Sequence, residues 1–355
     1  MTLSLTYRKW FVRFFIMFIF PVMPLALFNV IFDPLLCFSH INFLNEKAEL
    51  IDQRQQKTNL LTFGPRRFSS LVIGSSRTEL IRPKDIMNGK AFNYSAPAML
   101  ASEYEEYIDY FRKINLIKLD SLYIGLDFFT TNTKGPIKNE KPSTYFERTE
   151  QRLYRFKTTI SFDTLRAYLK KRWDTSYYYQ FDRKEGVTVF RQGVKYDMDK
   201  LLKDRLELFN KHFYSSDNYE YDTSFVQTCE TLRDSNSDVR LVVFTTPVSQ
   251  PLFEALVRAG RFEDYCRWIR EIVTVFGGVY NFMCLNNVTI NQSNFMDADH
   301  LFTDSAALVA HKISGFSDPR IPADFGVYVT RTNLEQHLTD VRKQADEILA
   351  RKQGA

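Results

Sequence analysis

The hydrophobic pattern separates an apolar N-terminal segment from a long region of short apolar runs. Residues 14–32 form a run of 19 residues without a charge, which is about the length that a helix needs to cross a bilayer core. Basic residues precede this run and acidic residues follow it, namely Arg8, Lys9 and Arg13 before and Asp33, Glu46, Glu49 and Asp52 after. The pattern therefore predicts a single-pass membrane anchor within residues 1–37, with the N-terminus in the cytoplasm and most of the chain outside it. A cleaved signal peptide is the alternative, but no small-x-small cleavage site follows the run.

A polar connector over residues 38–67 separates the anchor from the predicted globular region. It contains a short helical pattern that Gly64 and Pro65 interrupt. We expect the globular α/β domain to occupy residues 68–330. A mostly polar pattern with helical spacing over residues 331–355 predicts a C-terminal helical tail.

Apolar runs and helical repeats alternate through the predicted globular domain. The strand candidates are residues 71–73, 91–95, 121–129, 239–245 and 279–282. Helical spacing is found after Ser76 and over residues 102–114, 225–234, 252–276 and 304–314. This alternation is typical of a parallel sheet with helices on both faces, so we expect a three-layer α/β/α sandwich.

Residues from about 130 to 222 interrupt this alternation and form a central insertion. The segment is polar, basic and rich in tyrosine, with helical pieces such as residues 199–212. Its aromatic and basic residues either line a groove for an extended, glycan-like ligand or are ordinary surface side chains.

Composition supports a folded protein and excludes several classes of function. The chain has 355 residues, of which 45% are hydrophobic, so it can form a substantial core. Its net charge of +5 is dispersed along the chain, which argues against nucleic-acid binding. The four cysteines have no CxxC pair or Cys/His cluster, which argues against zinc, although one disulfide among Cys229, Cys266 and Cys284 stays open. We expect no cofactor and no metal.

Three residues in two short motifs carry the candidate chemistry. Ser76 follows the first predicted strand, and Asp297 and His300 follow the last one at a spacing of three residues. A serine hydroxyl needs a base, itself oriented by a third group, to act as a nucleophile. We therefore expect Ser76, His300 and Asp297 to form one catalytic site. The alternative is that Gly74-Ser75-Ser76 is only a strand-to-helix turn with a helix cap.

Two neighbouring charged residues have open roles. Arg77 is either a salt-bridge partner or a group that binds an anionic part of the substrate. Asp299 competes with Asp297 for His300, and we favour Asp297 because adjacent residues on a turn seldom face each other.

These motifs resemble those of the SGNH (GDSL-type) hydrolase superfamily, which has a Gly-Asp-Ser motif after the first strand and Asp-x-x-His near the end. Gly74-Ser75-Ser76 corresponds to the first motif and Asp297-Ala298-Asp299-His300 to the last. The resemblance covers about residues 68–130 and 239–314. It implies that Ser76 is the nucleophile, His300 the general base and Asp297 the residue that orients it.

The resemblance also places an oxyanion hole at two positions that depart from the family pattern. Ser95 stands where the family has a glycine N–H, and Asp127 stands where it has an asparagine side chain. A serine N–H can replace a glycine N–H, but an ionised Asp127 would repel a developing oxyanion.

The Gly-Ser-Ser-Arg motif, the anchor and the Gly-Leu-Asp-Phe-Phe strand end are more similar to the membrane-anchored bacterial envelope branch of this superfamily. That branch includes proteins related to D-alanylation of teichoic acid and O-acetylation of exopolysaccharide. The resemblance implies an acyltransferase or esterase in the bacterial cytoplasmic membrane, with its main domain in the periplasm or outside the cell. Its partners would be a cell-surface glycan or other acyl acceptor and a membrane-bound acyl-donor protein. The alternative is a catalytically silent binding or assembly protein of the cell envelope.

Overall fold

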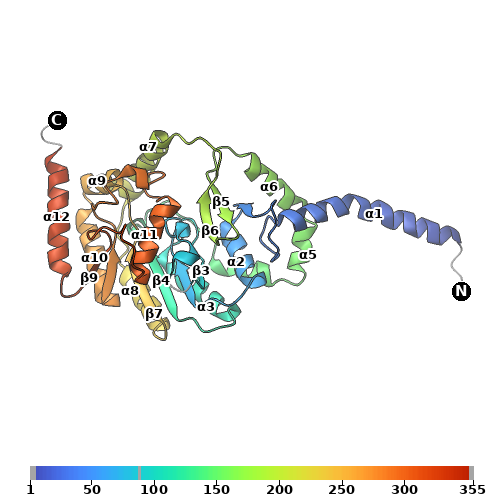
Figure 1. Ribbon diagram of the computed structural model, residues 1–355, viewed down its shortest axis with the longest axis horizontal. Helices are drawn as coiled ribbons and strands as arrows, with labels where there is room; N and C mark the ends of the chain where they lie inside the picture. The colour runs from blue at the N-terminus through green and yellow to red at the C-terminus, as the bar shows by residue number, and fades with distance from the viewer. Residues whose placement is uncertain (1–4, 87–88, 352–355) are drawn as a thin grey trace. The chain divides into compact units, whose positions relative to one another are not determined.

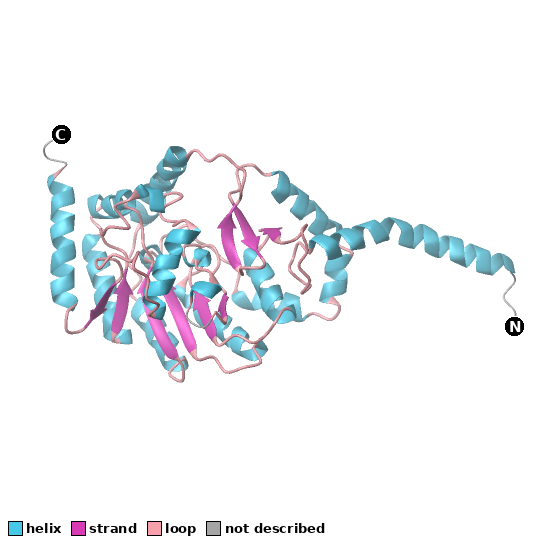
Figure 2. Ribbon diagram, in the orientation of Figure 1, coloured by secondary structure: helices cyan, strands magenta, loops and turns pink. Residues whose placement is uncertain are grey.

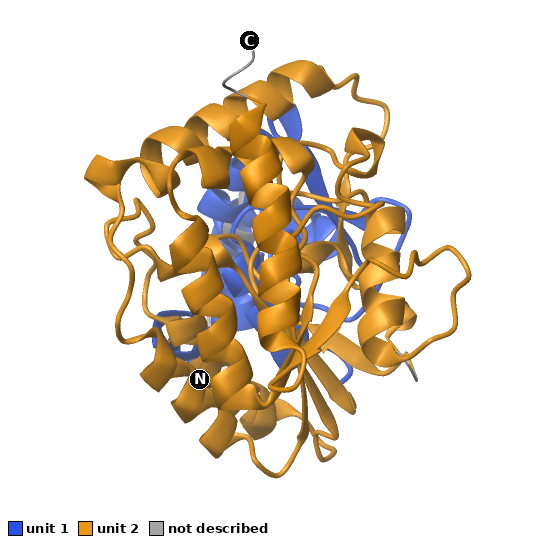
Figure 3. Cartoon of the chain, turned by 90° about the vertical axis from the view of Figure 1, so that its left-hand side faces the viewer, with its two compact units in different colours: residues 1–65, 143–184 blue, residues 66–142, 185–355 orange. Residues whose placement is uncertain are grey.

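The computed structural model describes residues 5–86 and 89–351, which divide into two compact units (Figure 3). Unit 1 contains Met1–Pro65 and Ser143–Lys184, and unit 2 contains Arg66–Pro142 and Glu185–Ala355. The predicted insertion is thus shared, because residues 143–184 belong to unit 1 and the rest of it to unit 2.

Unit 1 is a small assembly of helices with one antiparallel strand pair. Its elements are α1 (Leu5–Phe32), β1 (Lys47–Glu49), α2 (Gln53–Phe63), α4 (Pro142–Glu150), α5 (Tyr154–Thr159), α6 (Phe162–Trp173) and β5 (Tyr179–Asp182). The helix expected in the connector is α2, whose N-terminus is capped by the Asp52 side chain and whose C-cap is Gly64. Leu36, Ala48, Leu50 and Phe181 form a small apolar core. A buried ion pair between Asp33 Oδ2 and Arg183 Nη2, 2.9 Å apart, joins the two chain segments of this unit.

The predicted membrane anchor coincides with α1. Among the residues that the structure describes, no single helix meets the requirements of length and apolarity for a bilayer span. Two parts of α1, Tyr7–Met17 and Val22–Phe32, are long and apolar enough for a bilayer span only when they are taken together, and the helix bends by 42° between them. The anchor therefore stays a prediction.

Unit 2 is built on a six-stranded, mostly parallel sheet with helices on both sides (Figures 1 and 2). Its strand order is β3-β2-β4-β7-β8-β9. The strands are β2 (Ser70–Ile73), β3 (Ala91–Asn93), β4 (Ser121–Leu126), β7 (Arg240–Thr245), β8 (Gly278–Asn281) and β9 (Val327–Thr330). The longer helices are α3 (Tyr104–Ile114), α7 (Met198–Phe209), α8 (Phe225–Ser235), α9 (Gln250–Arg258), α10 (Phe262–Phe276), α11 (Thr303–Ser314) and α12 (Leu334–Ala350). A further strand, β6 (Val187–Phe190), lies outside this sheet.

The middle residues of the central strands are apolar because helices cover both faces of the sheet. Leu71, Val72 and Ile73 of β2 are fully buried, as are Leu122 and Ile124 of β4. Continuous apolar runs of this kind are typical of parallel strands inside a sheet. The chain passes from β2 to β3 on one side and then returns to β4 on the other side of β2. Ligands in open α/β sheets bind at such a reversal, at the carboxyl ends of the strands.

Three expectations about the elements were wrong. The turn after Ser76 leads into a single 3₁₀ turn, Thr78–Leu80, and not into an α-helix that Ser75 or Ser76 would cap. The sheet is not wholly parallel, because β9, which the pattern did not predict, pairs antiparallel with β8. The helical pattern over residues 252–276 forms two helices, since Gly260 between them has a φ of +75°.

Candidate active site

Ser76 lies at the carboxyl end of β2, on a turn that Ser75 and Gly74 shape. The Ser75 carbonyl accepts hydrogen bonds from the N–H groups of Thr78 and Glu79, at 3.0 and 3.3 Å, and its hydroxyl accepts one from the Arg77 N–H at 3.3 Å. Ser75 is fully buried, whereas Ser76 is partly exposed. A Cβ on Gly74 would collide with Thr78 Oγ1, so glycine is required at this position. The turn therefore uses Ser75 as its structural member and leaves the Ser76 hydroxyl available.

Asp297 and His300 lie on a narrow loop between η7 (Gln292–Asn294) and α11. The loop closes through a bridge between Phe295 and Leu301. The carbonyl of Ala298, at its tip, accepts hydrogen bonds from both the N–H and the hydroxyl of Ser249, at 3.0 and 2.8 Å. The Asp297 carboxylate also accepts the backbone N–H groups of Asp299 and His300, at 2.9 and 2.8 Å. The backbone thus fixes the carboxylate beside the imidazole.

The structure brings Ser76, His300 and Asp297 together in one hydrogen-bonded series. His300 Nε2 lies 2.9 Å from Ser76 Oγ, and His300 Nδ1 lies 2.8 Å from Asp297 Oδ2. When Nδ1 carries a proton and donates it to Asp297, Nε2 can accept the proton of the serine hydroxyl. This is the geometry that nucleophilic activation of a serine requires.

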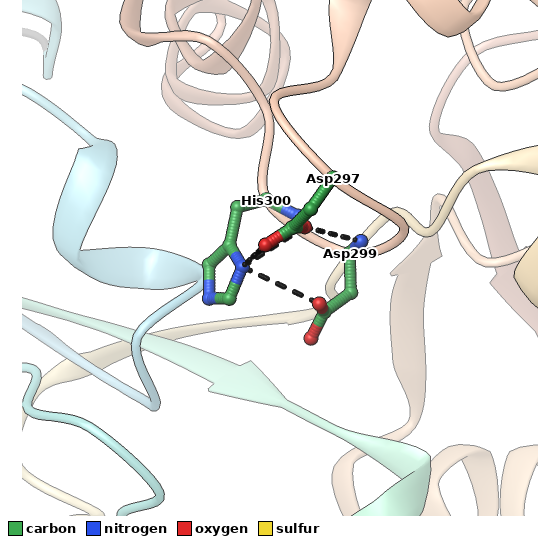
Figure 4. A group of neighbouring side chains, drawn as sticks. All are labelled: Asp297, Asp299 and His300. Carbon is green, nitrogen blue, oxygen red and sulfur yellow. Dashed lines mark hydrogen bonds and ion pairs between the residues drawn. The ribbon is translucent and has the colours of Figure 1, made fainter. Parts of the chain in front are cut away.

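Asp299 is a second carboxylate beside the same ring nitrogen. Figure 4 shows both carboxylates directed toward His300 Nδ1, and Asp299 Oδ1 lies 3.3 Å from it. Asp297 is nearer, as favoured above, but Asp299 also faces the ring. The imidazole is therefore held between two negative charges.

Two arginines hold Asp299 in place. Arg205 of α7 donates from Nε to Oδ1 at 2.5 Å and from Nη2 to Oδ2 at 2.9 Å. Arg77 donates from Nε to Oδ2 at 3.0 Å. These contacts, together with His300, hold the pKa of the fully buried Asp299 well below its usual range, although burial alone would raise it. Asp299 is thus an ionised group at the centre of the site.

The charge balance raises the proton affinity of His300. Burial alone would lower the pKa of this side chain, but the charges and hydrogen bonds of Asp297 and Asp299 outweigh burial and raise the pKa to about 9. At neutral pH the imidazole is therefore mostly protonated, and it acts as a base only after it loses this proton.

The two alternatives for Arg77 are resolved by its contacts. Its side chain is 3% exposed, and its guanidinium group pairs with Asp127 as well as Asp299. Its Nη1 lies 3.1 Å from Asp127 Oδ1 and 3.2 Å from Thr246 Oγ1. The group also lies over the ring of Phe129, at 4.9 Å from its centroid. Arg77 is therefore a buried salt-bridge residue that ties the carboxyl ends of β4 and β7 to the site.

The two positions assigned to the oxyanion hole are occupied by structural interactions. The Ser95 N–H donates to Asn93 Oδ1 at 3.1 Å. The Asp127 side chain is fully buried, and its Oδ1 accepts hydrogen bonds from Arg77 and Thr246. The Ser76 N–H makes no hydrogen bond within the described part of the chain. Of the three donors that the resemblance implied, only this backbone N–H is available.

Asp297, Asp299 and His300 also form a group whose potential ligand atoms lie within 4.8 Å of one another. Carboxylate and imidazole donors suit a divalent cation. However, Arg77 and Arg205 already neutralise Asp299, and a cation there would face both guanidinium groups. The donor set therefore fits proton transfer better than metal binding.

Sequence reasoning missed Arg205, Thr246 and Phe129. Arg205 comes from the predicted insertion, more than 90 residues before Asp299, and no short motif surrounds it. The position of Thr246 directly after the buried run 239–245 was the available signal, because strand ends meet at one edge of the sheet. The four cysteines are all free and buried, so no disulfide joins Cys229, Cys266 or Cys284.

Comparison of the chain with models of known protein families gave no match, and comparison with curated proteins also gave none.

Proposed function

We propose that this chain is a serine-dependent acyl-ester enzyme of the bacterial cell envelope, with an SGNH-like α/β/α domain. It would transfer an acyl group to a cell-surface glycan or a related acceptor, or hydrolyse such an ester. The motifs around Ser76 and His300 supply the family resemblance, and the mostly parallel sheet with helices on both sides agrees with it.

The observation that carries this proposal is the series Ser76, His300 and Asp297. A Ser76 Oγ to His300 Nε2 distance of 2.9 Å, with Asp297 at 2.8 Å behind the ring, joins three residues that lie up to 224 positions apart. All three lie at the edge of the sheet where open α/β folds bind ligands.

The geometry supports a two-step reaction. Neutral His300 accepts the hydroxyl proton while Ser76 Oγ forms a bond to the acyl carbonyl carbon. The resulting imidazolium ion, stabilised by Asp297, gives the proton to the leaving oxygen as the ester bond breaks, which leaves an acyl-serine. A hydroxyl of the acceptor, or water, then attacks this acyl-serine, and His300 takes the attacking proton and returns it to Ser76 Oγ. Transfer and hydrolysis differ only in the molecule that takes the acyl group.

A non-catalytic binding or assembly protein is the second candidate, and the state of Asp127 and Ser95 favours it. With the Ser95 N–H bonded to Asn93 and Asp127 paired with Arg77, the described residues offer few donors to an oxyanion. Such donors contribute about 3–4 kcal/mol each to transition-state stabilisation in acyl transfer. A chain without them would keep the fold but have little activity.

We further propose that α1 attaches the chain to the cytoplasmic membrane and that the chain after α1 lies on its outer side. The charge asymmetry around residues 14–32 supports this orientation. Many large apolar side chains of α1 are exposed, among them Trp10, Phe11, Met17, Phe20 and Met23. A lipid environment would remove this surface from water.

Fluorophosphonate labelling of the full chain in detergent, followed by peptide mass spectrometry, tests the catalytic proposal. We expect the probe on Ser76 and its loss in Ser76→Ala. Ser75→Ala is the matched control, because it removes the adjacent hydroxyl but keeps the nucleophile. Absence of label on a folded chain, judged by the emission of buried Trp268, would reject the enzyme in favour of the binding protein.

A further inference from the structure

Helix α6 in unit 1 exposes an apolar stripe that no other described part of this unit covers. Phe162, Leu169 and Trp173 are 67%, 40% and 78% exposed. Together with the exposed Arg166, they follow a spacing of four, three and four residues, which places them on one face of a helix. Such a face is costly in water and indicates a surface that binds another apolar phase.

The opposite side of α6 packs within unit 1. Thr164 is buried, and Tyr168 contacts the rings of Phe28 and Phe32 of α1, with centroids 5.4 and 5.5 Å apart. Exposure of the stripe is therefore not a sign of a loosely attached helix, because the other face of α6 is fixed to α1.

Basic residues surround the stripe. Residues 151–173 contain seven arginines and lysines and one acidic residue, a net charge of +6, against +5 for the whole chain. Arg152, Lys157, Arg166 and Lys170 are exposed, and none makes an ion pair within the described chain. An apolar face with a basic border is typical of a helix that lies on an anionic lipid surface.

The attachment of α5 and α6 to α1 would place these two helices at the depth of the lipid headgroups. Asn29 Nδ2 donates to the carbonyls of Thr159 and Ser161, both at 3.0 Å, so the turn between α5 and α6 is bound near the C-terminal end of α1. On the described part of α1, exposed large apolar side chains run on several sides of the helix up to Met23, and beyond it Leu27 and Ile31, four residues apart, stay exposed while Asn29 is buried. At about 1.5 Å per residue, Asn29 lies roughly 9 Å beyond Met23 along the helix axis, near the C-terminal end of the apolar segment. If α1 spans the bilayer core, this is the depth of the lipid headgroups.

We infer that α5 and α6 form an interfacial element that lies in the headgroup layer of an anionic membrane. Phe162, Leu169 and Trp173 enter the boundary between headgroups and acyl chains, and the basic residues contact lipid phosphates. This inference rests on the proposed membrane attachment through α1. It adds a second contact, which would fix the tilt of unit 1 on the membrane surface.

Tryptophan quenching by brominated lipids tests the inference with the full chain in vesicles. The three tryptophans are Trp10, Trp173 and Trp268, and Trp268 is fully buried in unit 2. Trp10→Phe reports on Trp173, Trp173→Phe reports on Trp10, and the double variant gives the background from Trp268. In vesicles of phosphatidylglycerol brominated near the headgroup end of its chains, we expect loss of Trp173 emission relative to unbrominated lipid.

A charge-reversal pair separates lipid binding from other causes. In Arg166→Glu/Lys170→Glu, quenching of Trp173 should fall while quenching of Trp10 is unchanged. Lys343→Glu/Arg351→Glu, on and after α12, carries the same change of charge and should leave both signals unchanged. Equal quenching of Trp173 in the two double variants would overturn the role of the basic residues.

The two proposals fail in distinguishable ways. Quenching of Trp10 without quenching of Trp173 would keep the anchor and overturn the interfacial element. Absence of both would overturn the anchor as well. Protection of Trp173 from aqueous iodide without lipid quenching would overturn the inference in favour of a protein partner or a second copy on this face.

Discussion

The raised pKa of His300 leads to a prediction about the pH dependence of serine labelling. Only the neutral imidazole can accept the proton of Ser76, and the carboxylates of Asp297 and Asp299 raise the pKa of the ring from 6.5 to about 9. At pH 7 only about one molecule in a hundred then has a neutral His300, whereas half do at pH 9. The rate of labelling at Ser76 should therefore rise roughly fiftyfold between pH 7 and pH 9.

The assay is the second-order rate of fluorophosphonate labelling at each pH, measured on the full chain and corrected for hydrolysis of the probe. Ser76, Asp297 and Asp299 contact the ring, and Arg77 and Arg205 pair with Asp299. Asp299→Asn removes one of the two negative charges, so we expect the midpoint of the profile to fall by about one pH unit or more. Labelling of this variant at pH 7 should be correspondingly faster per folded molecule.

Asp304→Asn is the control, because this carboxylate is 88% exposed and pairs with Arg82. Its profile should match that of the unchanged chain. A midpoint near 6.5 in the unchanged chain, or an unshifted midpoint in Asp299→Asn, would refute the reasoning.

Three further predictions concern the residues around this site. Arg77→Met should lower the free energy of unfolding by about 3–5 kcal/mol, since it leaves the buried Asp127 carboxylate without its charged partner and removes one of the two arginines that pair with Asp299. Urea titration of Trp268 emission measures this, and Arg320→Met, at an ion pair whose arginine is 60% exposed, should change less. Asp127→Asn should lower the free energy of unfolding and give no gain of Ser76 labelling, because the Asp127 side chain is buried against Arg77 and Thr246. A tenfold gain of labelling would show instead that the aspartate suppresses activity. Gly74→Ala should destabilise the chain by about 1–3 kcal/mol and slow the labelling of Ser76, because the new methyl group would collide with Thr78. An unchanged labelling rate would contradict the role given to this turn.

Sequence reasoning found the elements whose local pattern is strong. The apolar runs of β2, β4 and β7 identified buried parallel strands, and the spacing of Asp297 and His300 identified a pair that the structure joins. Both signals lie within a few residues, so they can be read without knowledge of the fold.

Features that depend on tertiary contacts could not be predicted in this way. Arg205 reaches Asp299 only because α7 packs near the site, and the strand β9 carries four residues with no distinctive alternation. Asp127 was expected to face the oxyanion as a free charge, but its partner Arg77 follows a different strand. Sequence reveals the charge of such residues and not the counter-ion that determines their role.

The division of unit 1 into two chain segments has a consequence for the order of events during synthesis. Arg183, the buried partner of Asp33, follows it by 150 residues. At about 5–20 residues per second, the ribosome needs roughly 8–30 s to make that stretch. During this time Asp33 has no counter-ion, and β2, β3 and β4 of the other unit emerge before unit 1 can close. The first segment translated therefore cannot complete its fold until residue 183 has been made, and a chain released before that residue would leave its N-terminal segment unfinished.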